Sequence, residues 1–556
     1  MKLTGGQALA QQLVKEGITD VFGVPGVQLD WAFDGLRRVK DQIRVIVTRH
    51  EQATAYMADG YARTTGRIGT CMVVPGPGLL NAMAGLSTAY ACNSRVLCIS
   101  GNIFSAGVGK GHGLLHEVRN QSEILGAVTK WRSAAKSPKE VPGVVREAVR
   151  QANSGKPQPV GLEISHDVLS ASDEVDLIDP PAGEDGRIKP DAKEIAKAAS
   201  LLAGARFPVI YSGGGVIAAR ASDALAALAD KLQAPVVMSD HGRSGLPDTH
   251  PLALNTLGGR AVFPHADVVL IVGSRFIEFN QGTPAWPADG KTYIYLNADP
   301  TDWSEPRTSS LSIRADARLG LEALAAELSA KNPSRAEDIR KVRAWVDHQA
   351  NEMEPLIGYT RAMREAMPDD GIFVMDLTLA GYFSRLMYQS RKPYTFVTPG
   401  YQGTLGYAYG AGLGAAAGNP GRAVISVSGD GGFGWNMQEL STARAYNLGL
   451  VSVIFNDGGY GNVRMMMKNQ FGEAYGTELH NPHYDRLAGA FDIPYARADE
   501  PQALRRALKD AIGRGGPALI EVRLGPLPNP WKLFRLQPPF GQVSTAPPNP
   551  LGDPAA

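Results

Sequence analysis

Two acidic residues in glycine-rich turns are the clearest candidates for chemistry in this sequence. Asp430 lies in Gly429-Asp430-Gly431, directly after the apolar run 423–427, and Asp457 follows the apolar run 451–455. If these runs are parallel strands, both carboxylates stand at the sheet edge where α/β proteins form ligand sites. Two carboxylates beside glycine backbone and a helix N-terminus could hold a divalent cation bound to phosphate. Taken alone, Gly-Asp-Gly is usually an ordinary polar turn, so a functional assignment needs further motifs.

The elements that would position these residues alternate along most of the chain. Apolar runs such as 70–74 and 96–100 have the length and composition of buried strands. Segments of helical period, such as 51–64, 79–91 and 436–446, follow or separate them. Strands that alternate with helices predict βαβ units and parallel sheets, and therefore an α/β fold.

The alternation recurs in three blocks, which we predict to be three domains with doubly wound parallel sheets. The predicted boundaries are 1–170, 190–335 and 354–528, followed by a Pro-rich C-terminal tail at 529–556. A segment rich in Asp, Pro and Gly, 170–191, reads as a linker, and the charged helical stretch 334–352 leads into the third block. The prolines after Leu524 predict a tail without regular elements.

Composition excludes several classes of partner. The 556 residues include 56 Lys plus Arg and 55 Asp plus Glu, so no charge excess draws the chain to nucleic acid or an anionic membrane. The longest uncharged stretch tested, 398–421, is rich in Gly, Ala and Tyr, which suits tight packing better than a membrane span. Three cysteines are too few for a disulfide framework, and the start lacks the apolar run of a signal peptide. We expect a cytoplasmic protein without nucleic-acid or membrane partners.

Several motifs occur together in the order found in one enzyme superfamily. Gly-Asp-Gly followed by Asn456-Asp457 resembles the thiamin-diphosphate-binding motif. The segments 21–26, 49–52, 58–63 and 76–78 are similar to the first domain of the acetolactate synthase and 2-oxoacid decarboxylase superfamily. The resemblance spans about 3–524. It implies an N-terminal pyrimidine-binding domain, a Rossmann-like central domain and a C-terminal diphosphate-binding domain.

The resemblance also implies thiamin diphosphate and Mg²⁺ as cofactors. Asp430 and Asp457 would bind the metal with their side chains and Gly459 with its carbonyl oxygen, while the diphosphate and a water complete the octahedron. Many relatives carry Asn at the position of Asp457, so a second carboxylate makes this site one charge more negative. The other implied cofactor contacts are Gly403, Leu405, Gly429, Gly431, Gly432, Tyr460, Pro25 and Gly76.

Glu51, within Arg49-His50-Glu51-Gln52, is implied to be the activating acid. In the family it hydrogen-bonds N1′ of the cofactor's aminopyrimidine and favours the 4′-imino form, which removes the proton from C2. The segment 403–406 matches the one that bends the cofactor. There Leu405 would be the apolar wedge, and the Gly403 carbonyl would accept a hydrogen bond from the 4′-amino group. An isolated Glu would instead be a surface helix charge, and a wedge leucine is a core residue in any case.

The substrate end matches no single branch of the superfamily. His116, Glu117 and Gln121 lie in the implied active-site loop and are catalytic candidates. Glu117 stands where acetolactate synthases have Gln, and His116 where they have Phe. Glu117 and Gln121 are instead similar to a Glu and a Gln of oxalyl-CoA decarboxylases. Met466 replaces a Trp of anabolic acetolactate synthases, so neither assignment carries over whole.

Two further features have a plain and a functional interpretation. His112 and His116 with Glu117 could bind zinc, but Gly113 weakens the helix that this spacing needs, and a polar loop cluster is favoured. Gly213-Gly214-Gly215 lacks a full dinucleotide fingerprint, so a structural turn is favoured there. Related enzymes bind FAD, a CoA adenylate or nothing at that position, which leaves FAD or ADP/CoA as alternatives.

These observations predict a thiamin-diphosphate- and Mg²⁺-dependent C–C lyase or carboligase, similar to acetolactate synthase and benzoylformate decarboxylase, that acts on a 2-oxoacid. One alternative is a 2-hydroxyacyl-CoA lyase or oxalyl-CoA decarboxylase with an acyl-CoA substrate. Another is a non-catalytic regulatory protein that retains the fold. The family builds each site from the first domain of one subunit and the third domain of its neighbour, which implies a homodimer or a dimer of dimers (a homotetramer).

Overall fold

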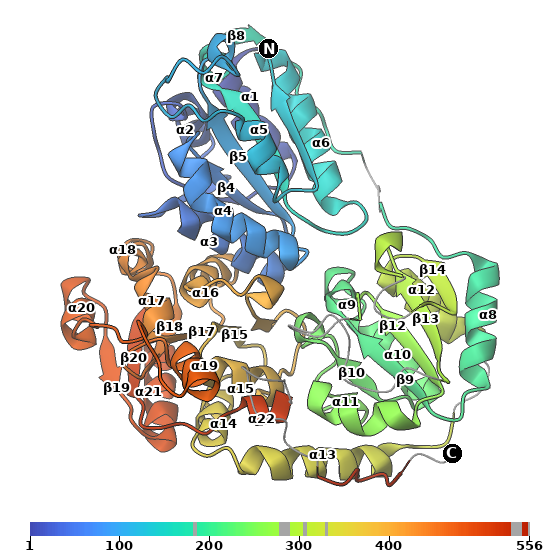
Figure 1. Cartoon of the computed structure of the whole chain (residues 1–556). Coiled ribbons are helices and arrows are strands. Elements are labelled where there is room, and N and C mark those ends of the chain that lie inside the picture. Colours follow the sequence, from blue (N-terminus) through green and yellow to red (C-terminus); the bar gives the residue numbers. More distant parts are fainter. Residues whose placement is uncertain (182–185, 277–289, 304–307, 329–331, 535–546, 554–556) are drawn as a thin grey trace.

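The computed structural model describes residues 1–181, 186–276, 290–303, 308–328, 332–534 and 547–553. Within these ranges three six-stranded parallel sheets follow one another along the chain, each flanked by helices (Figure 1). The prediction of an α/β fold with three doubly wound parallel sheets is confirmed. Among the described residues, no helix combines the length and apolar character that crossing a membrane requires.

The N-terminal sheet has the strand order β3-β2-β4-β5-β7-β6. Its strands are β2 (Asp20–Gly23), β3 (Arg44–Val47), β4 (Gly69–Val73), β5 (Val96–Asn102), β6 (Trp131–Ala135) and β7 (Val160–Ser165). The flanking helices are α1 (Gly5–Lys15), α2 (Asp30–Arg38), α3 (Glu51–Thr65), α4 (Pro77–Ala91), α5 (Gln121–Gly126), α6 (Val141–Asn153) and α7 (His166–Ser170). Every residue of β4 is buried, as expected for a parallel strand with helices on both faces.

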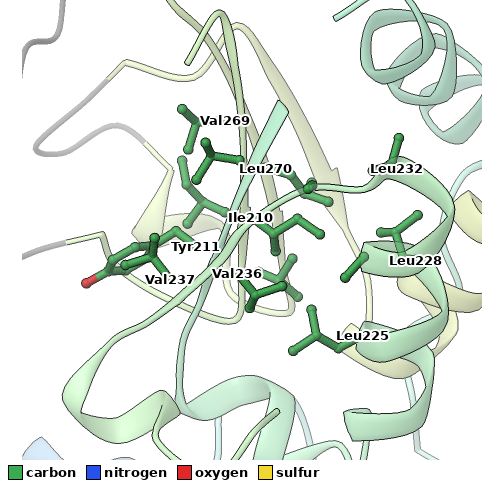
Figure 2. Packing of buried hydrophobic residues seen from close by; sticks show 14 of the residues in the cluster. Ile210, Tyr211, Leu225, Leu228, Leu232, Val236, Val237, Val269 and Leu270 are labelled. Atoms are coloured by element: carbon green, nitrogen blue, oxygen red, sulfur yellow. The ribbon is translucent and has the colours of Figure 1, made fainter. Parts of the chain in front are cut away.

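The central sheet has the order β11-β10-β9-β12-β13-β14. Its strands are β9 (Pro208–Ser212), β10 (Val236–Met238), β11 (Ala253–Leu254), β12 (Val268–Val272), β13 (Thr292–Asn297) and β14 (Leu311–Arg314), and its helices are α8 (Ala192–Ala203), α9 (Gly214–Ala218), α10 (Ser222–Leu232), α11 (Thr256–Val262) and α12 (Ala317–Glu327). Figure 2 shows Leu225, Leu228 and Leu232 of α10 beside the apolar strands β9 and β10. Burying one such leucine contributes about 1.5–3 kcal/mol.

The third sheet, which carries the acidic turns, has the order β16-β15-β17-β18-β20-β19. Its strands are β15 (Ile372–Met375), β16 (Phe396–Val397), β17 (Val424–Gly429), β18 (Leu450–Asn456), β19 (Tyr495–Arg497) and β20 (Ala518–Arg523). After α13 (Ala336–Asn351), the helices are α14 (Leu356–Ala366), α15 (Leu379–Met387), α16 (Tyr407–Gly418), α17 (Asp430–Gly434), α18 (Leu440–Ala445), α19 (Gly461–Phe471), α20 (Tyr484–Ala490) and α21 (Pro501–Arg514).

Two glycines let the N-terminal and C-terminal domains meet through their helices α3 and α16 (Figure 1). A Cβ at Gly60 of α3 would lie 2.0 Å from the Ala411 carbonyl oxygen, and one at Gly414 of α16 would lie 1.9 Å from the Met57 carbonyl oxygen. The helix backbones therefore touch at these positions, where no side chain fits. Glu51 begins α3 and the segment 403–406 precedes α16, so this contact fixes the two segments relative to each other.

Three predictions about local elements need correction. The proposed linker 170–191 is partly structured, because β8 (Ser172–Glu174) pairs antiparallel with β1 (Lys2–Thr4). The single helix expected at 436–446 is a 3₁₀ turn followed by α18. The tail begins with a short helix, α22 (Trp531–Phe534), although we expected no regular element there. The tail prediction also covers 535–546 and 554–556, which lie outside the described residues.

Candidate active site

Asp430 and Asp457 end neighbouring parallel strands and open into one cavity. Asp430 follows β17 and Asp457 follows β18, and the register pairs Gly429 with Phe455. The cavity measures about 250 Å³. All the C-terminal-domain candidates line it: Gly403, Leu405, Gly429, Asp430, Gly431, Gly432, Asp457, Gly459 and Tyr460. The sequence therefore identified residues that the fold brings together from three separate segments.

The two carboxylates form an electrostatically unfavourable pair. Burial, followed by the charge of Asp430, raises the pKa of Asp457 to about 6, and Arg464 opposes the shift. Burial also raises the pKa of Asp430, against a hydrogen bond donated by the Asn481 side chain. A hard divalent cation between the carboxylates would relieve their repulsion, and oxygen donors suit Mg²⁺. The donor set therefore fits a magnesium ion.

Glycine residues leave room beside these two carboxylates. A Cβ at Gly461 would lie 1.7 Å from Asp457 Oδ2, and one at Gly431 would lie 2.7 Å from the Tyr460 ring. Glycine at these positions leaves space beside the carboxylates at the starts of α17 and α19, which suits a diphosphate. Gly403 has φ +63°, a left-handed conformation that favours glycine and directs the turn before Leu405.

A polar network that the sequence did not reveal supports the acidic pair. Asn481 donates from Nδ2 to Asp430 Oδ2 and to Asn456 Oδ1, and Asn456 Nδ2 donates to Glu521 Oε1 at 2.8 Å. Glu521 is buried and also accepts from the Tyr495 hydroxyl at 2.6 Å. Asn481 lies in a loop far from both acidic turns in the chain, so no motif marks it.

Asp376 is a third acidic residue in this cavity that sequence reasoning missed. It follows β15, the strand next to β17, and it lines the cavity with only 1% of its surface exposed. Burial raises the pKa of its carboxyl to about 6, and hydrogen bonds from backbone N–H groups of Leu377, Ala408 and Gly406 oppose the shift. Asp-Leu-Thr after a strand has no glycine signature, which explains the omission.

Glu51 lies away from this cavity in a single chain. It begins α3, and its Oε2 accepts a hydrogen bond from Asn81 Nδ2 of α4 at 2.9 Å. The preceding backbone N–H groups of Arg49 and His50 donate to Glu439 of the C-terminal domain. Glu51, Pro25 and Gly76 do not line the cavity between β15, β17 and β18, as far as the described residues show.

The loop candidates also stay within the N-terminal domain. Gln121 is buried, accepts from the Gly76 backbone N–H at 3.0 Å, and donates to Glu163. His116 Nδ1 lies 3.1 Å from Gln28 Oε1. Glu117 accepts from the backbone N–H groups of Gly111 and Leu114, and these bonds, Leu114 first, lower the pKa of its exposed carboxyl. Gln121 and Glu117 therefore hold the loop and Gly76 in place within one chain.

The zinc alternative gains no support from the geometry. Within the described part of the chain, no group of three or more His, Cys, Asp or Glu side chains is arranged to hold a metal ion. The acidic pair at 430 and 457 would need the Gly459 carbonyl and ligand oxygens to complete a shell, as its family pattern implies.

A second cavity, of about 120 Å³, lies where residues of all three domains meet. Gly214 and Gly215 at the start of α9 line it, at the carboxyl end of β9. Three basic residues, Arg95, Lys156 and Arg275, line the cavity together with the acidic Asp316. A Cβ at Gly213 would lie 2.3 Å from the Gly273 carbonyl oxygen, so this first glycine is needed for packing whatever binds nearby.

The chain is similar to known proteins over most of its length. Three family models match: "Thiamine pyrophosphate enzyme, N-terminal TPP binding domain" over 3–124, the central domain of the same enzymes over 195–324, and their C-terminal TPP binding domain over 378–522. The chain is 34% identical to a probable 2-ketoarginine decarboxylase, AruI, of Pseudomonas aeruginosa, over 94% of both chains. It is 30% identical to an acetolactate synthase of Arthrospira platensis over 94% of both chains, and 29% identical to the large subunit of acetolactate synthase isozyme 3 of Escherichia coli over 92% of both.

Proposed function

Because the chain belongs to the thiamine pyrophosphate enzyme family, we propose that it is a Mg²⁺-dependent decarboxylase or carboligase that acts on a 2-oxoacid. The observation that carries this proposal is the pair Asp430 and Asp457, which shares one cavity with the glycines of both turns. The relatives named as decarboxylase and acetolactate synthases support the reaction class.

Different residues of this cavity would bind different parts of the cofactor. Asp430, Asp457 and the Gly459 carbonyl would bind Mg²⁺, and the bare backbone at Gly431 and Gly432 would receive the diphosphate. Leu405 is half-buried in the cavity wall and would support the bend between the two rings. Thiamin diphosphate, when bound, supplies a carbon nucleophile for addition to the substrate carbonyl.

The site is completed by a second copy of the chain in this proposal. Glu51 is partly exposed beside Asn81, and its neighbour on α4, Leu80, is an exposed apolar residue. Other large apolar side chains are exposed on both domains: Val27, Phe104 and Leu115 on the N-terminal domain, and Val463, Phe471 and Tyr475 on the C-terminal domain. Leu115 is 64% exposed and Tyr475 is 91% exposed, so both could contact a partner chain in the proposed dimer. A two-fold dimer would bring Glu51 of one subunit to the cavity of the other.

The central cavity supports a second candidate, an acyl-CoA lyase of the same family. Its Arg95, Lys156 and Arg275 could bind the phosphates of a CoA adenylate, ADP or FAD. Burial lowers the pKa of Arg95, as do the charges of Arg220 and Arg187, while Tyr394 and Asp316 oppose the shift; a bound anion would oppose it as well. Binding of ADP, CoA or FAD by the full-length protein, measured by calorimetry, distinguishes the candidates.

A substrate screen tests the proposed reaction. We expect release of CO₂ from at least one of pyruvate, benzoylformate, a branched-chain oxoacid, a guanidino 2-oxoacid or oxalyl-CoA, dependent on thiamin diphosphate and Mg²⁺. Asp430→Ala should lose cofactor retention in equilibrium dialysis, because the diphosphate then lacks its bridging metal. Asp369→Ala, at the other end of β15, is the matched control and should retain it. Unchanged affinity of Asp430→Ala would show that the metal site is misplaced.

A further inference from the structure

Asp376 connects the cofactor cavity to the helix that carries the wedge segment. The carboxyl stands at the end of β15, and its Oδ1 accepts from the Leu377 backbone N–H at 2.8 Å. The backbone N–H groups of Gly406 and Ala408 also face this carboxyl and oppose the rise of its pKa. Gly406 is the N-cap of α16 and has no side chain of its own to cap the helix.

A helix N-terminus of this kind needs an acceptor from elsewhere. The first N–H groups of α16 have no partner within the helix, and a negative charge is favourable near them. Asp376 supplies that acceptor from a neighbouring segment of the sheet. Because Gly403 and Leu405 directly precede the helix, the carboxyl fixes the turn that places both residues in the cavity wall.

The second carboxyl oxygen is the observation that points to a ligand. Asp376 Oδ2 is buried and has no hydrogen-bond partner among the described residues. It faces Gly432, where an added Cβ would lie 2.9 Å from it, and both residues line the cavity. Buried polar atoms in proteins are almost always paired, so an unpaired oxygen in a cavity wall calls for a donor that is not part of this chain.

We propose that Asp376 is an anchor for the bound cofactor: its Oδ1 accepts from the Leu377 N–H beside the 403–406 turn, and its Oδ2 accepts a hydrogen bond from a donor that arrives with thiamin diphosphate. The inference rests on the proposed function, because it takes thiamin diphosphate as the ligand of this cavity. The cavity would then hold three functional acidic residues: Asp430 and Asp457, which would bind the metal, and Asp376 after β15, which would bind the cofactor.

The isosteric variant Asp376→Asn separates the two roles of the carboxyl. An amide offers one acceptor oxygen only, which in the cofactor-free protein should stay with the backbone N–H groups. Its NH₂ group then takes the place of Oδ2. This group cannot accept a hydrogen bond from the donor of the cofactor. The cofactor-free variant should therefore melt at a temperature no lower than the wild type, while its Kd for thiamin diphosphate with Mg²⁺ rises at least tenfold.

Calorimetric titration and thermal unfolding of the full-length protein test this assignment. Asp369→Asn, before the same strand, is the control and should bind as the wild type does. Asp376→Ala loses both acceptors and should show both a lower melting temperature and a higher Kd. An Asn variant that binds within twofold of the wild type would overturn the assignment. So would weaker binding accompanied by a lower melting temperature, since a structural role would explain both. Failure of the wild type to bind thiamin diphosphate would refute the proposed function, and this assignment with it.

Discussion

Among single residues, Glu51 carries the most specific chemical expectation. Glu51→Gln keeps the size of the side chain and can still pair with Asn81, but it cannot share a proton with the cofactor ring. Turnover should fall on the order of 10²-fold or more, the scale of a lost acid–base role, while Kd for thiamin diphosphate changes little. Steady-state rates and calorimetry measure the two quantities. Glu123→Gln, at an exposed position of α5, is the control, and a Glu51→Gln enzyme as active as that control would remove Glu51 from the mechanism.

Asp376 gives the cofactor-free protein a pH dependence. Its pKa rises to about 6 on folding, above the ordinary value near 4, so the folded state binds the proton more tightly than the unfolded chain. The stability contributed by this carboxyl should therefore be present below about pH 4 and be lost as the pH rises from about 4 to 6, by about 1–3 kcal/mol. Urea unfolding of wild type and Asp376→Asn between pH 4 and 7.5 measures it. Parallel pH curves for the two proteins would contradict the assignment.

Residues at strand ends that have glycine neighbours could be predicted from the sequence, whereas residues defined by tertiary contacts could not. Asp430 and Asp457 carry glycine neighbours and a fixed order in the chain, so both were placed in one site. Asp376 and Asn481 have no local signature, because their roles depend on α16 and on the folded turn at Asp430. Gln121 was expected at the substrate, but in one chain its side chain is buried against Gly76 and Glu163.

Among the elements, the C-terminal helix α22 departs most from expectation. Trp531 is fully buried, its ring centroid lies 4.5 Å from that of Tyr382, and its Nε1 donates to Asn462 Oδ1 at 2.7 Å. Tyr382 and Asn462 both line the cofactor cavity. The many prolines of the tail predicted no regular element, and a single tryptophan in the sequence did not indicate a buried helix. The strands were easier to predict, because a buried parallel strand is a continuous apolar run.

Removing the Trp531 ring should release the tail from the cavity wall. Trp531→Ala should cost about 3–5 kcal/mol locally and should speed proteolytic cleavage of the tail. Trp531→Phe keeps an aromatic ring beside Tyr382 and loses the hydrogen bond to Asn462, so it should cost about 1 kcal/mol. Limited proteolysis followed by mass spectrometry measures the effect. Equal cleavage rates for wild type and Trp531→Ala would contradict the role of α22.

At the scale of the whole molecule, the account depends on how two chains complete a site. Within the described residues of one chain, the candidate acid at the start of α3 and the acidic pair after β17 and β18 do not share a cavity. The exposed apolar side chains on both domains favour a dimer in which they do. Light scattering should therefore show at least a dimer, and an active monomer would exclude this arrangement.

Mixed dimers test the central claim most directly. Subunits with Glu51→Gln and subunits with Asp430→Ala are mixed under conditions where subunit exchange is proven. Exchange of the C2 hydrogen of bound thiamin diphosphate for deuterium is then followed by NMR, which needs no known substrate. One site of each hybrid unites the wild-type Glu51 of one chain with the wild-type Asp430 of the other. We predict rapid C2 exchange in the mixture. Neither parent protein should show rapid exchange by itself. Slow exchange in the mixture, despite proven hybrids, would contradict the account.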